Sequence, residues 1–322
     1  MIVVTGGAGF IGSAMVSKLN EKGISDILVV DELGTSTKWK NLVGKQFTDY
    51  LYKEHFLDAL LGERLPKIEA IIHMGANSST TEKDVEHLME NNYRYTRVLA
   101  EWSIRKKVRF IYASSGATYG DGTLGFSDDD ATSLTLRPLN AYGYSKQVFD
   151  QWLLHNGMQN KVAGIKFFNV FGPNEYHKGE MKSLVCKAYN QILEIGKIRL
   201  FKSYRPEYKH GEQVRDFVYI KDCAEVMWWL LNSPKVNGIF NLGTGTARTW
   251  NDLAKAIFAA LGVVPNIEYI EMPDELRGAY QYHTEADTRK IFAAGCPVTF
   301  RSLEESVKDY VQRYLHPELR YL

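Results

Sequence analysis

The stretch "VTGGAGFIG", residues 4–12, constrains the fold more than any other part of the chain. Gly6, Gly9 and Gly12 stand at three-residue spacing between an apolar run and an amphipathic segment. A glycine turn between a strand and a helix lets the backbone approach a pyrophosphate, and the start of the helix supplies N–H donors. This context predicts an α/β fold of the Rossmann type, with a doubly wound parallel sheet.

A carboxylate follows at the position that such a turn requires. Asp31 ends the next apolar run, "DILVVD", where its oxygens can bond the hydroxyls of an adenosine ribose. The two features together predict a bound nicotinamide dinucleotide. Asp31 and Glu32 would repel a 2′-phosphate, whereas Lys38 and Lys40 can neutralise one, so NAD stays open while we favour NADP.

The rest of the chain alternates in the manner of a parallel sheet with helices on both faces. Strands are expected at 2–6, 26–31, 70–76, 109–114 and 161–170, and helices near 10–22, 82–106 and 142–155. Thr249 is a candidate N-cap, and Gly262 a candidate end, of a later helix. We expect a dinucleotide-binding domain over 1–170, to which about 215–250 returns, and a smaller, interleaved substrate-binding lobe over 171–322.

Composition excludes several classes of function. Lys plus Arg number 39 against 38 for Asp plus Glu, so no overall field favours nucleic acid or an anionic membrane. Three scattered cysteines and a lone His177 lack the spacing of a metal site, and we expect no metal. No segment has the length of a membrane span, and "MIVVTGG" is typical of a core strand rather than a signal peptide. We therefore expect a cytoplasmic enzyme with a small ligand.

Two further motifs carry catalytic groups. "YASSGATYG" (112–120) follows an expected strand, and "NAYGYSKQ" (140–147) opens an expected helix. Tyr142 and Lys146 are four residues apart and share one helical face. A phenol, whose pKa is ordinarily about 10, becomes a general base when a cation lowers that pKa, and Lys146 can do so while it holds the cofactor ribose. Ser115 can then hydrogen-bond the alkoxide or ketone.

These motifs resemble the extended short-chain dehydrogenase/reductases that act on nucleotide sugars. "TGGAGFIG", "SSGATYG", "YGYSK", "RDFVYIKD" and "NLGTG" carry the resemblance over essentially the whole chain. It implies epimerisation, dehydration, decarboxylation or reduction. Dehydratases of that family carry an Asp-Glu pair just after the serine, where this chain has "GAT", which disfavours dehydration.

One subgroup is more similar than the rest, the ADP-glycero-manno-heptose 6-epimerases, which make the heptose precursor of bacterial lipopolysaccharide. "HMGANSSTTE", "NNYRYT", "FFNVFGPNEYHKGEMKS", "RDFVY" and "LRGAYQ" carry this resemblance. It implies that Tyr142 and Lys178 form an acid/base pair and that the chain forms a homo-oligomer, for which a pentamer is one candidate. Glu32 and Glu180 depart from the smaller neutral residues of the subgroup, which leaves cofactor choice and sugar contacts open.

The resemblance also implies two sets of binding residues. For the cofactor these are Gly6, Gly9, Phe10, Ile11, Gly12, Asp31, Glu32, Lys38, Lys53, Gly75, Ala76, Asn77, Ser78, Ser79, Asn92, Lys146, Val170 and Lys178. For the substrate they are Ser115, Asn169, Glu180, Lys187, Phe201, Lys202, Ser203, Tyr204, Arg215 and Tyr280. A guanidinium can bond phosphate oxygens bidentately, so Arg215 is the candidate for the diphosphate. For Phe201 and Tyr280, packing in the core is an equal alternative.

A second base has a chemical reason. Inversion through a ketone requires hydride to return to the opposite face, and a carbon outside the sugar ring can expose that face by rotating about its bond to the ring. The oxygen then moves beyond the reach of Tyr142, so a second proton donor and acceptor must lie at its new position. Lys178 can serve if burial and nearby positive charge, from Lys146 and the oxidised nicotinamide, lower its pKa. The alternatives for Lys178 are a solvated loop lysine or a phosphate contact.

We therefore predict an epimerase that interconverts ADP-D-glycero-D-manno-heptose and ADP-L-glycero-D-manno-heptose at carbon 6. The alternative is a 4-epimerase or a reductase acting on another nucleotide sugar. A non-catalytic, redox-sensing protein of the same fold is disfavoured, because Tyr142 and Lys146 are both present.

Overall fold

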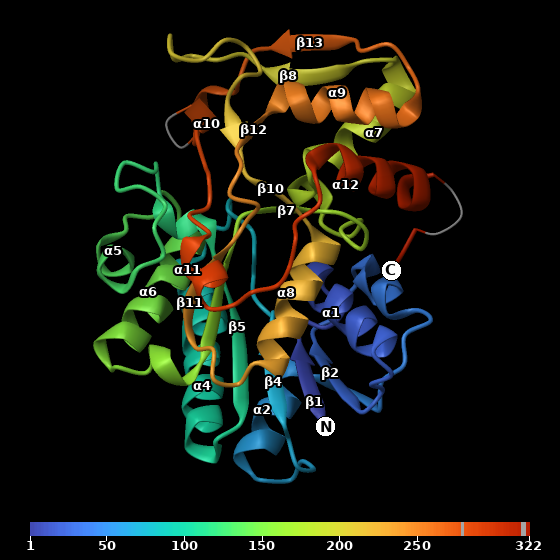
Figure 1. Cartoon of the computed structure of the whole chain (residues 1–322). Helices are drawn as coiled ribbons and strands as arrows, with labels where there is room; N and C mark the ends of the chain where they lie inside the picture. Colours follow the sequence, from blue (N-terminus) through green and yellow to red (C-terminus); the bar gives the residue numbers. More distant parts are fainter. Residues whose placement is uncertain (278–279, 317–319) are drawn as a thin grey trace.

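A seven-stranded parallel sheet forms the centre of the molecule (Figure 1). The structure is a computed structural model that describes residues 1–277, 280–316 and 320–322. The strand order is β11-β6-β5-β4-β1-β2-β3, which confirms the predicted doubly wound Rossmann-type fold. The strands are β1 (Ile2–Thr5), β2 (Ile27–Asp31), β3 (Asp49–Tyr52), β4 (Ala70–His73), β5 (Arg109–Ser115), β6 (Ala163–Phe167) and β11 (Gly238–Leu242).

Helices cover both faces of this sheet because its inner strands are apolar on both sides. Met15 of α1 (Phe10–Glu21) and Met227 of α8 (Ile220–Asn232) share one core with Val4. The opposite core holds Val3 together with residues from α2 (Lys53–Leu61), α4 (Tyr95–Lys106) and α6 (Ala141–His155). Chain order reverses between β1 and β4, so the carboxyl ends of these strands open a crevice of the kind in which such sheets bind ligands.

A smaller lobe lies above these carboxyl ends (Figure 1). Its elements include α7 (Leu184–Ile195), α9 (Trp250–Leu261), α12 (Leu303–Tyr310) and the parallel pair β8 (Ile198–Phe201) and β13 (Ile267–Ile270). Two short pairs join the parts: β7 (Asn169–Phe171) with β10 (Phe217–Tyr219), and β9 (Val214–Arg215) with β12 (Arg248–Thr249). The remaining helices are α3 (Val85–Leu88), α5 (Asp130–Thr135), α10 (Asp274–Arg277) and α11 (Arg289–Ala293).

The predicted ends of α9 are confirmed. Thr249 caps its start in a reciprocal arrangement with Asp252, and Gly262 closes it with a left-handed φ of 70°. Other boundaries differ from the sequence prediction. The expected helix over 82–106 is divided by a π-helical segment, Met89–Arg94, between α3 and α4. The expected strand over 161–170 divides into β6 and β7, and the latter pairs with β10 outside the large sheet.

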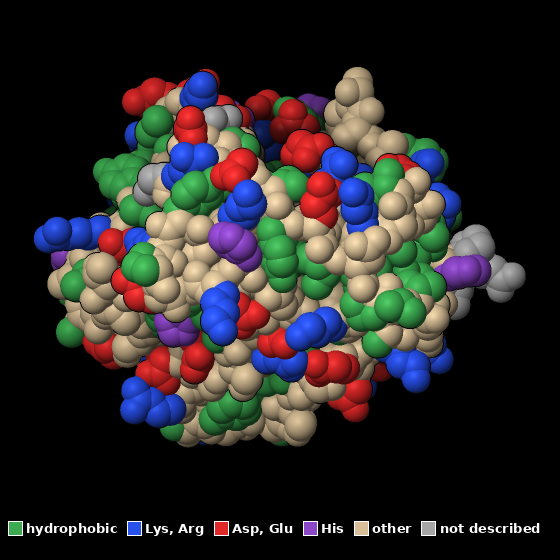
Figure 2. Space-filling model, turned by 90° about the horizontal axis from the view of Figure 1, so that it is seen from above, with side chains coloured by type: hydrophobic (Ala, Val, Ile, Leu, Met, Phe, Trp, Pro, Cys, Tyr) green, Lys and Arg blue, Asp and Glu red, His purple; other side chains and the backbone are tan. Residues whose placement is uncertain are grey.

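Charge is evenly spread over the surface seen in Figure 2, where Lys and Arg side chains alternate with Asp and Glu. That pattern agrees with the balance of 39 basic and 38 acidic residues. Among the described residues, every helix is too short or too polar to cross a bilayer.

Candidate active site

The crevice contains a cavity of about 680 Å³ in which most of the predicted site residues meet. Its walls come from the glycine turn, the end of β5, the start of α6 and the loop after β7. The predicted residues that line it are Gly6, Gly9, Phe10, Ile11, Gly12, Asp31, Lys38, Gly75, Ala76, Ser78, Ser115, Tyr142, Lys146, Asn169, Val170 and Lys178. The structure therefore brings the two predicted acid/base groups, Tyr142 and Lys178, to one cavity.

The glycine turn has no room for side chains. Gly6 has a φ of 62°, and a Cβ there would lie 2.6 Å from the amide nitrogen of Gly75. A Cβ on Gly12 would lie 2.1 Å from the carbonyl oxygen of Gly6. Gly9 caps α1 without a side chain, so the first-turn amides of this helix face the cavity. A bare, positively polarised backbone of this kind fits a pyrophosphate.

A second hollow of about 340 Å³ adjoins the turn and is lined by four charged residues, Asp31, Glu32, Lys38 and Lys53. Lys38 Nζ lies 2.6 Å from Asp31 Oδ1, and Lys53 Nζ lies 2.9 Å from Glu32 Oε2. The hydrogen bond from Lys53 lowers the pKa of Glu32. Each lysine is thus matched by one carboxylate. Lys40, the other lysine considered for a phosphate, lies over the ring of Trp39 instead.

Ser115, Tyr142 and Lys146 lie at the junction of β5 and α6. Ser115 ends β5, and Asn140 caps α6 by accepting a hydrogen bond from Gly143 N at 2.8 Å. Lys146 Nζ donates to the carbonyl oxygen of Ala113 at 2.9 Å. Burial lowers the pKa of Lys146 to about 8, against the opposing charge of Asp150.

The pKa of Tyr142 is raised by burial, and its interaction with the Ser115 hydroxyl opposes that rise. A phenol in this position needs a nearby cation to release its proton near neutral pH. Lys146, one helical turn further along α6, is placed to provide that cation.

Lys178 lies in a tight loop between β7 and α7. Its Nζ is 5.1 Å from the centroid of the Phe10 ring, at the start of α1. Burial lowers the pKa of Lys178, as predicted, but the neighbouring charge that acts on it is the Glu175 carboxylate, which opposes the shift. Glu175 is fully buried and accepts hydrogen bonds from Ser183 Oγ at 2.7 Å and from Gly172 N at 3.3 Å. This carboxylate therefore fixes the loop at both ends.

Asn41 connects this loop to the glycine turn, a role that the sequence analysis did not predict. Its Nδ2 donates to the carbonyl oxygens of Ala8 at 2.9 Å and Asn174 at 3.0 Å, and contacts His177 Nδ1 at 3.3 Å. Burial and the charges of Lys38 and Lys178 lower the pKa of His177 to about 4, so its ring is neutral at physiological pH. The positions of the pyrophosphate turn and of Lys178 are thus set together.

On the substrate side, Arg215 lies in a cluster with two aromatic side chains. Its guanidinium lies 5.6 Å from the ring of Trp250 and 5.1 Å from that of Tyr280, and Trp250 Nε1 donates to the Tyr280 hydroxyl at 2.9 Å. Trp250 lines the large cavity, although the sequence did not identify it. Thr284, also missed, lines the same cavity and donates to Asn169 Oδ1 at 3.4 Å.

Ten predicted residues lie outside both cavities: Ser79, Asn92, Glu180, Lys187, Phe201, Lys202, Ser203, Tyr204, Arg215 and Tyr280. Asn92 is fully buried and brackets Asn77, accepting from its N–H and donating to its carbonyl oxygen, each at 2.9 Å. It therefore fixes the position of the 75–79 loop without lining either cavity itself. Gly278 and Ala279 of the "LRGAYQ" motif lie outside the described residues.

On the lobe side, Lys187 pairs with Glu180 at 3.2 Å and Lys202 pairs with Glu271. The guanidinium of Arg277 lies over the ring of Tyr204 at 4.0 Å. Within the described ranges, His, Cys, Asp and Glu side chains form no group of three or more that could hold a metal ion.

The chain is similar to proteins of one family over most of its length. Residues 2–243 match the model of the NAD dependent epimerase/dehydratase family. The chain is similar to the ADP-L-glycero-D-manno-heptose-6-epimerase of Nitratidesulfovibrio vulgaris, with 60% identity over 98% of both chains. The enzyme of the same name from Fusobacterium nucleatum is 49% identical over 100% of both chains. The crystal structure of the Helicobacter pylori protein of that name superposes with a TM-score of 0.82 at 29% identity, covering 96% of this chain and 94% of the other.

Proposed function

Since this chain belongs to the NAD-dependent epimerase/dehydratase family, we propose that it interconverts the two carbon-6 epimers of ADP-glycero-manno-heptose. The direction of use is from ADP-D-glycero-D-manno-heptose to ADP-L-glycero-D-manno-heptose, for the inner core of lipopolysaccharide. The observation that carries this proposal is that Tyr142 and Lys178, from separate parts of the chain, line the same cavity.

The cofactor is NADP, with NAD as the alternative. The bare glycine turn fits the pyrophosphate, and Lys38 and Lys53 lie in the adjoining hollow where they can meet a 2′-phosphate. When bound, the nicotinamide takes a hydride from the sugar carbon and returns it. Lys146 is placed to hold the ribose and to lower the pKa of the Tyr142 phenol.

The chain's own residues manage the protons. Tyr142 takes the proton of the sugar hydroxyl while Ser115 donates a hydrogen bond to the same oxygen. After the exocyclic carbon has rotated, the oxygen lies on the side of Lys178, which donates the proton of the inverted alcohol. Burial lowers the pKa of the Lys178 amine, and a lowered pKa makes its ammonium form a better proton donor to the new oxygen.

The ADP portion has a candidate site beside the sugar. Arg215, whose guanidinium lies near the rings of Trp250 and Tyr280, can bond the diphosphate, and Asn169, which lines the cavity, can bond the sugar. We further propose a cytoplasmic homo-oligomer, with a pentamer as the first form to test.

The test is a proton-NMR assay with each ADP-heptose epimer and no added cofactor. We expect either epimer to give a mixture of both at carbon 6. Recovery of a single unchanged epimer refutes the assignment. A 4-epimerase would act with Tyr142 alone and would keep nearly full activity after Lys178→Met.

A further inference from the structure

A buried ion pair lies directly beneath the proposed catalytic groups. Lys166 of β6 and Asp150 of α6 are both 0% exposed, and Lys166 Nζ lies 2.7 Å from Asp150 Oδ2. Replacing such a pair by apolar side chains of similar size is often neutral or even stabilising. The stability of the fold therefore gives little reason for its presence, and its position suggests a different reason.

Asp150 accepts hydrogen bonds from the two residues of β5 that flank Ala113, the residue that binds Lys146. Its carboxylate accepts from the Tyr112 hydroxyl at 2.8 Å and from Ser114 Oγ at 2.7 Å. Ala113, between these two, supplies the carbonyl oxygen that accepts from Lys146 Nζ. Asp150 is also one helical turn beyond Lys146 on the same face of α6.

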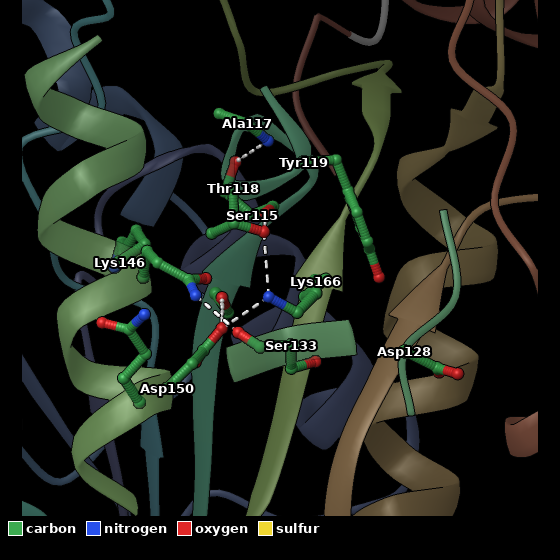
Figure 3. A network of polar contacts seen from close by, with 12 residues as sticks. Ser115, Ala117, Thr118, Tyr119, Asp128, Ser133, Lys146, Asp150 and Lys166 are labelled. Carbon is green, nitrogen blue, oxygen red and sulfur yellow. Dashed lines mark hydrogen bonds and ion pairs between the residues drawn. The ribbon is translucent and has the colours of Figure 1, made fainter. Parts of the chain in front are cut away.

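Lys166 extends the network to the catalytic serine (Figure 3). Its Nζ donates to Thr118 Oγ1 at 2.8 Å, and Thr118 Oγ1 in turn donates to the carbonyl oxygen of Ser115 at 2.8 Å. Figure 3 shows the side chains of Asp150 and Lys166 pointing toward each other from α6 and β6, while Lys146 reaches toward them from the opposite side of the view. The ion pair is thus linked by hydrogen bonds to the part of β5 that carries Ser115 and binds Lys146.

We propose that Asp150 is a positioning residue for the reaction, which keeps the Lys146 ammonium charged and aimed beside Tyr142, and that Lys166 holds Asp150 in place. This inference rests on the proposed roles of Tyr142 and Lys146.

The charges around Lys146 agree with this role. Tyr142 and Asp150 each lie one helical turn from Lys146 on α6, and the charge of Lys146 also acts on His73 of β4. The groups that face Asp150 are Tyr112 and Ser114 of β5 and Lys166 of β6. Burial, with the charge of Lys146, lowers the pKa of His73 to about 3, so the imidazole is neutral. Asp150 is the group whose charge raises the pKa of Lys146 against burial. Removing that charge lets the pKa of Lys146 fall below about 8, so less of it is protonated at neutral pH and the phenol of Tyr142 ionises less readily.

The experiment uses the purified protein with its bound nucleotide and three variants. Asp150→Asn removes the charge, and Asp150→Asn with Lys166→Met removes the whole ion pair without leaving a lone buried cation. Asp222→Asn is the matched control, since Asp222 is also a buried helical aspartate paired with a cation, Arg301, but lines neither cavity.

The first readout is the ultraviolet titration of tyrosinate, taken as the difference from the same protein carrying Tyr142→Phe. The second is the pH profile of epimerisation. For both Asp150 variants we expect the pKa of Tyr142 to rise by about one unit. We also expect the alkaline limb of the activity profile to shift to lower pH by about one unit. We expect turnover near pH 8 to fall about tenfold, while Asp222→Asn changes thermal stability without moving either curve.

If Tyr142 ionises at the same pH in the double variant as in the unchanged protein, the proposal is refuted. The network would then serve only the packing of the fold. The titration needs no substrate. A protein that shows the shift but does not convert ADP-heptose would refute the proposed function and retain this inference.

Discussion

If the hollow lined by Asp31, Glu32, Lys38 and Lys53 binds the 2′-phosphate of NADP, as we propose, removing the charge of Glu32 should strengthen that binding by a calculable amount. The carboxylate is 52% exposed and its Oε2 lies 2.9 Å from Lys53 Nζ. A half-exposed ion pair contributes about 0.2–1 kcal/mol, which a phosphate must offset when it recruits Lys53. Glu32 also remains near the incoming dianion and repels it. Together these effects amount to about 1 kcal/mol, so Glu32→Gln should raise the affinity for NADP roughly fivefold.

The affinity for NAD should change less than twofold, because NAD carries no phosphate at that position. The assay is calorimetric titration of nucleotide-stripped protein with each cofactor, together with mass-spectrometric identification of the nucleotide that copurifies. Glu54→Gln is the matched control, since Glu54 is the exposed carboxylate next to Lys53 and lines neither cavity. An equal change in the affinities for NADP and NAD would show that the Glu32–Lys53 pair does not sense the phosphate.

Three further changes test other parts of the site. Lys178→Met should lower kcat/KM for epimerisation about 10²–10⁴-fold with bound cofactor and thermal stability retained, measured by NMR and a melting curve; near-normal turnover contradicts the second-base role. Gly12→Ala places a Cβ 2.1 Å from the Gly6 carbonyl oxygen, so we expect the unfolding free energy to fall by about 1–3 kcal/mol and the copurifying nucleotide to be lost. Retention of both the stability and the nucleotide would contradict the role of the glycine turn in binding the pyrophosphate. Arg215→Lys removes the guanidinium that lies near the rings of Trp250 and Tyr280, and we expect KM for the ADP-sugar to rise roughly tenfold with kcat little changed. A drop in kcat alone would place Arg215 at the reacting carbon instead.

Features determined by local spacing could be predicted from the sequence. The glycine turn, Asp31 at the end of β2, and Tyr142 four residues before Lys146 each require a strand or a helix of regular geometry. The Thr249 cap and the Gly262 end of α9 were predictable for the same reason. The edge strand β3 was not, because its sequence "DYLY" is half-exposed and too short to show alternation.

Contacts between distant parts of the chain could not be predicted in this way. Asn41 lies in an ordinary polar stretch, and its role depends on Ala8 and on Asn174, which is 133 residues further along. The sequence indicates only that Trp250 begins an amphipathic helix. Its position beside Arg215 depends on the pairing of β12 with β9. Asn92 turns inward because the π-helical segment shifts its position on the helix, and no periodicity in the sequence indicates such a segment.

The outer strand of the large sheet has a consequence for how the chain is made. β11 is formed by residues 238–242 and pairs along the whole of β6, from Gly238–Ala163 to Leu242–Phe167. As the chain leaves the ribosome, some 70 residues must emerge after β6 before that partner exists. Until then β6, which is buried in the finished protein, is a strand with an open edge. We expect a fragment ending at residue 200 to aggregate and one ending at residue 250 to stay dispersed, which sedimentation after translation in vitro would show.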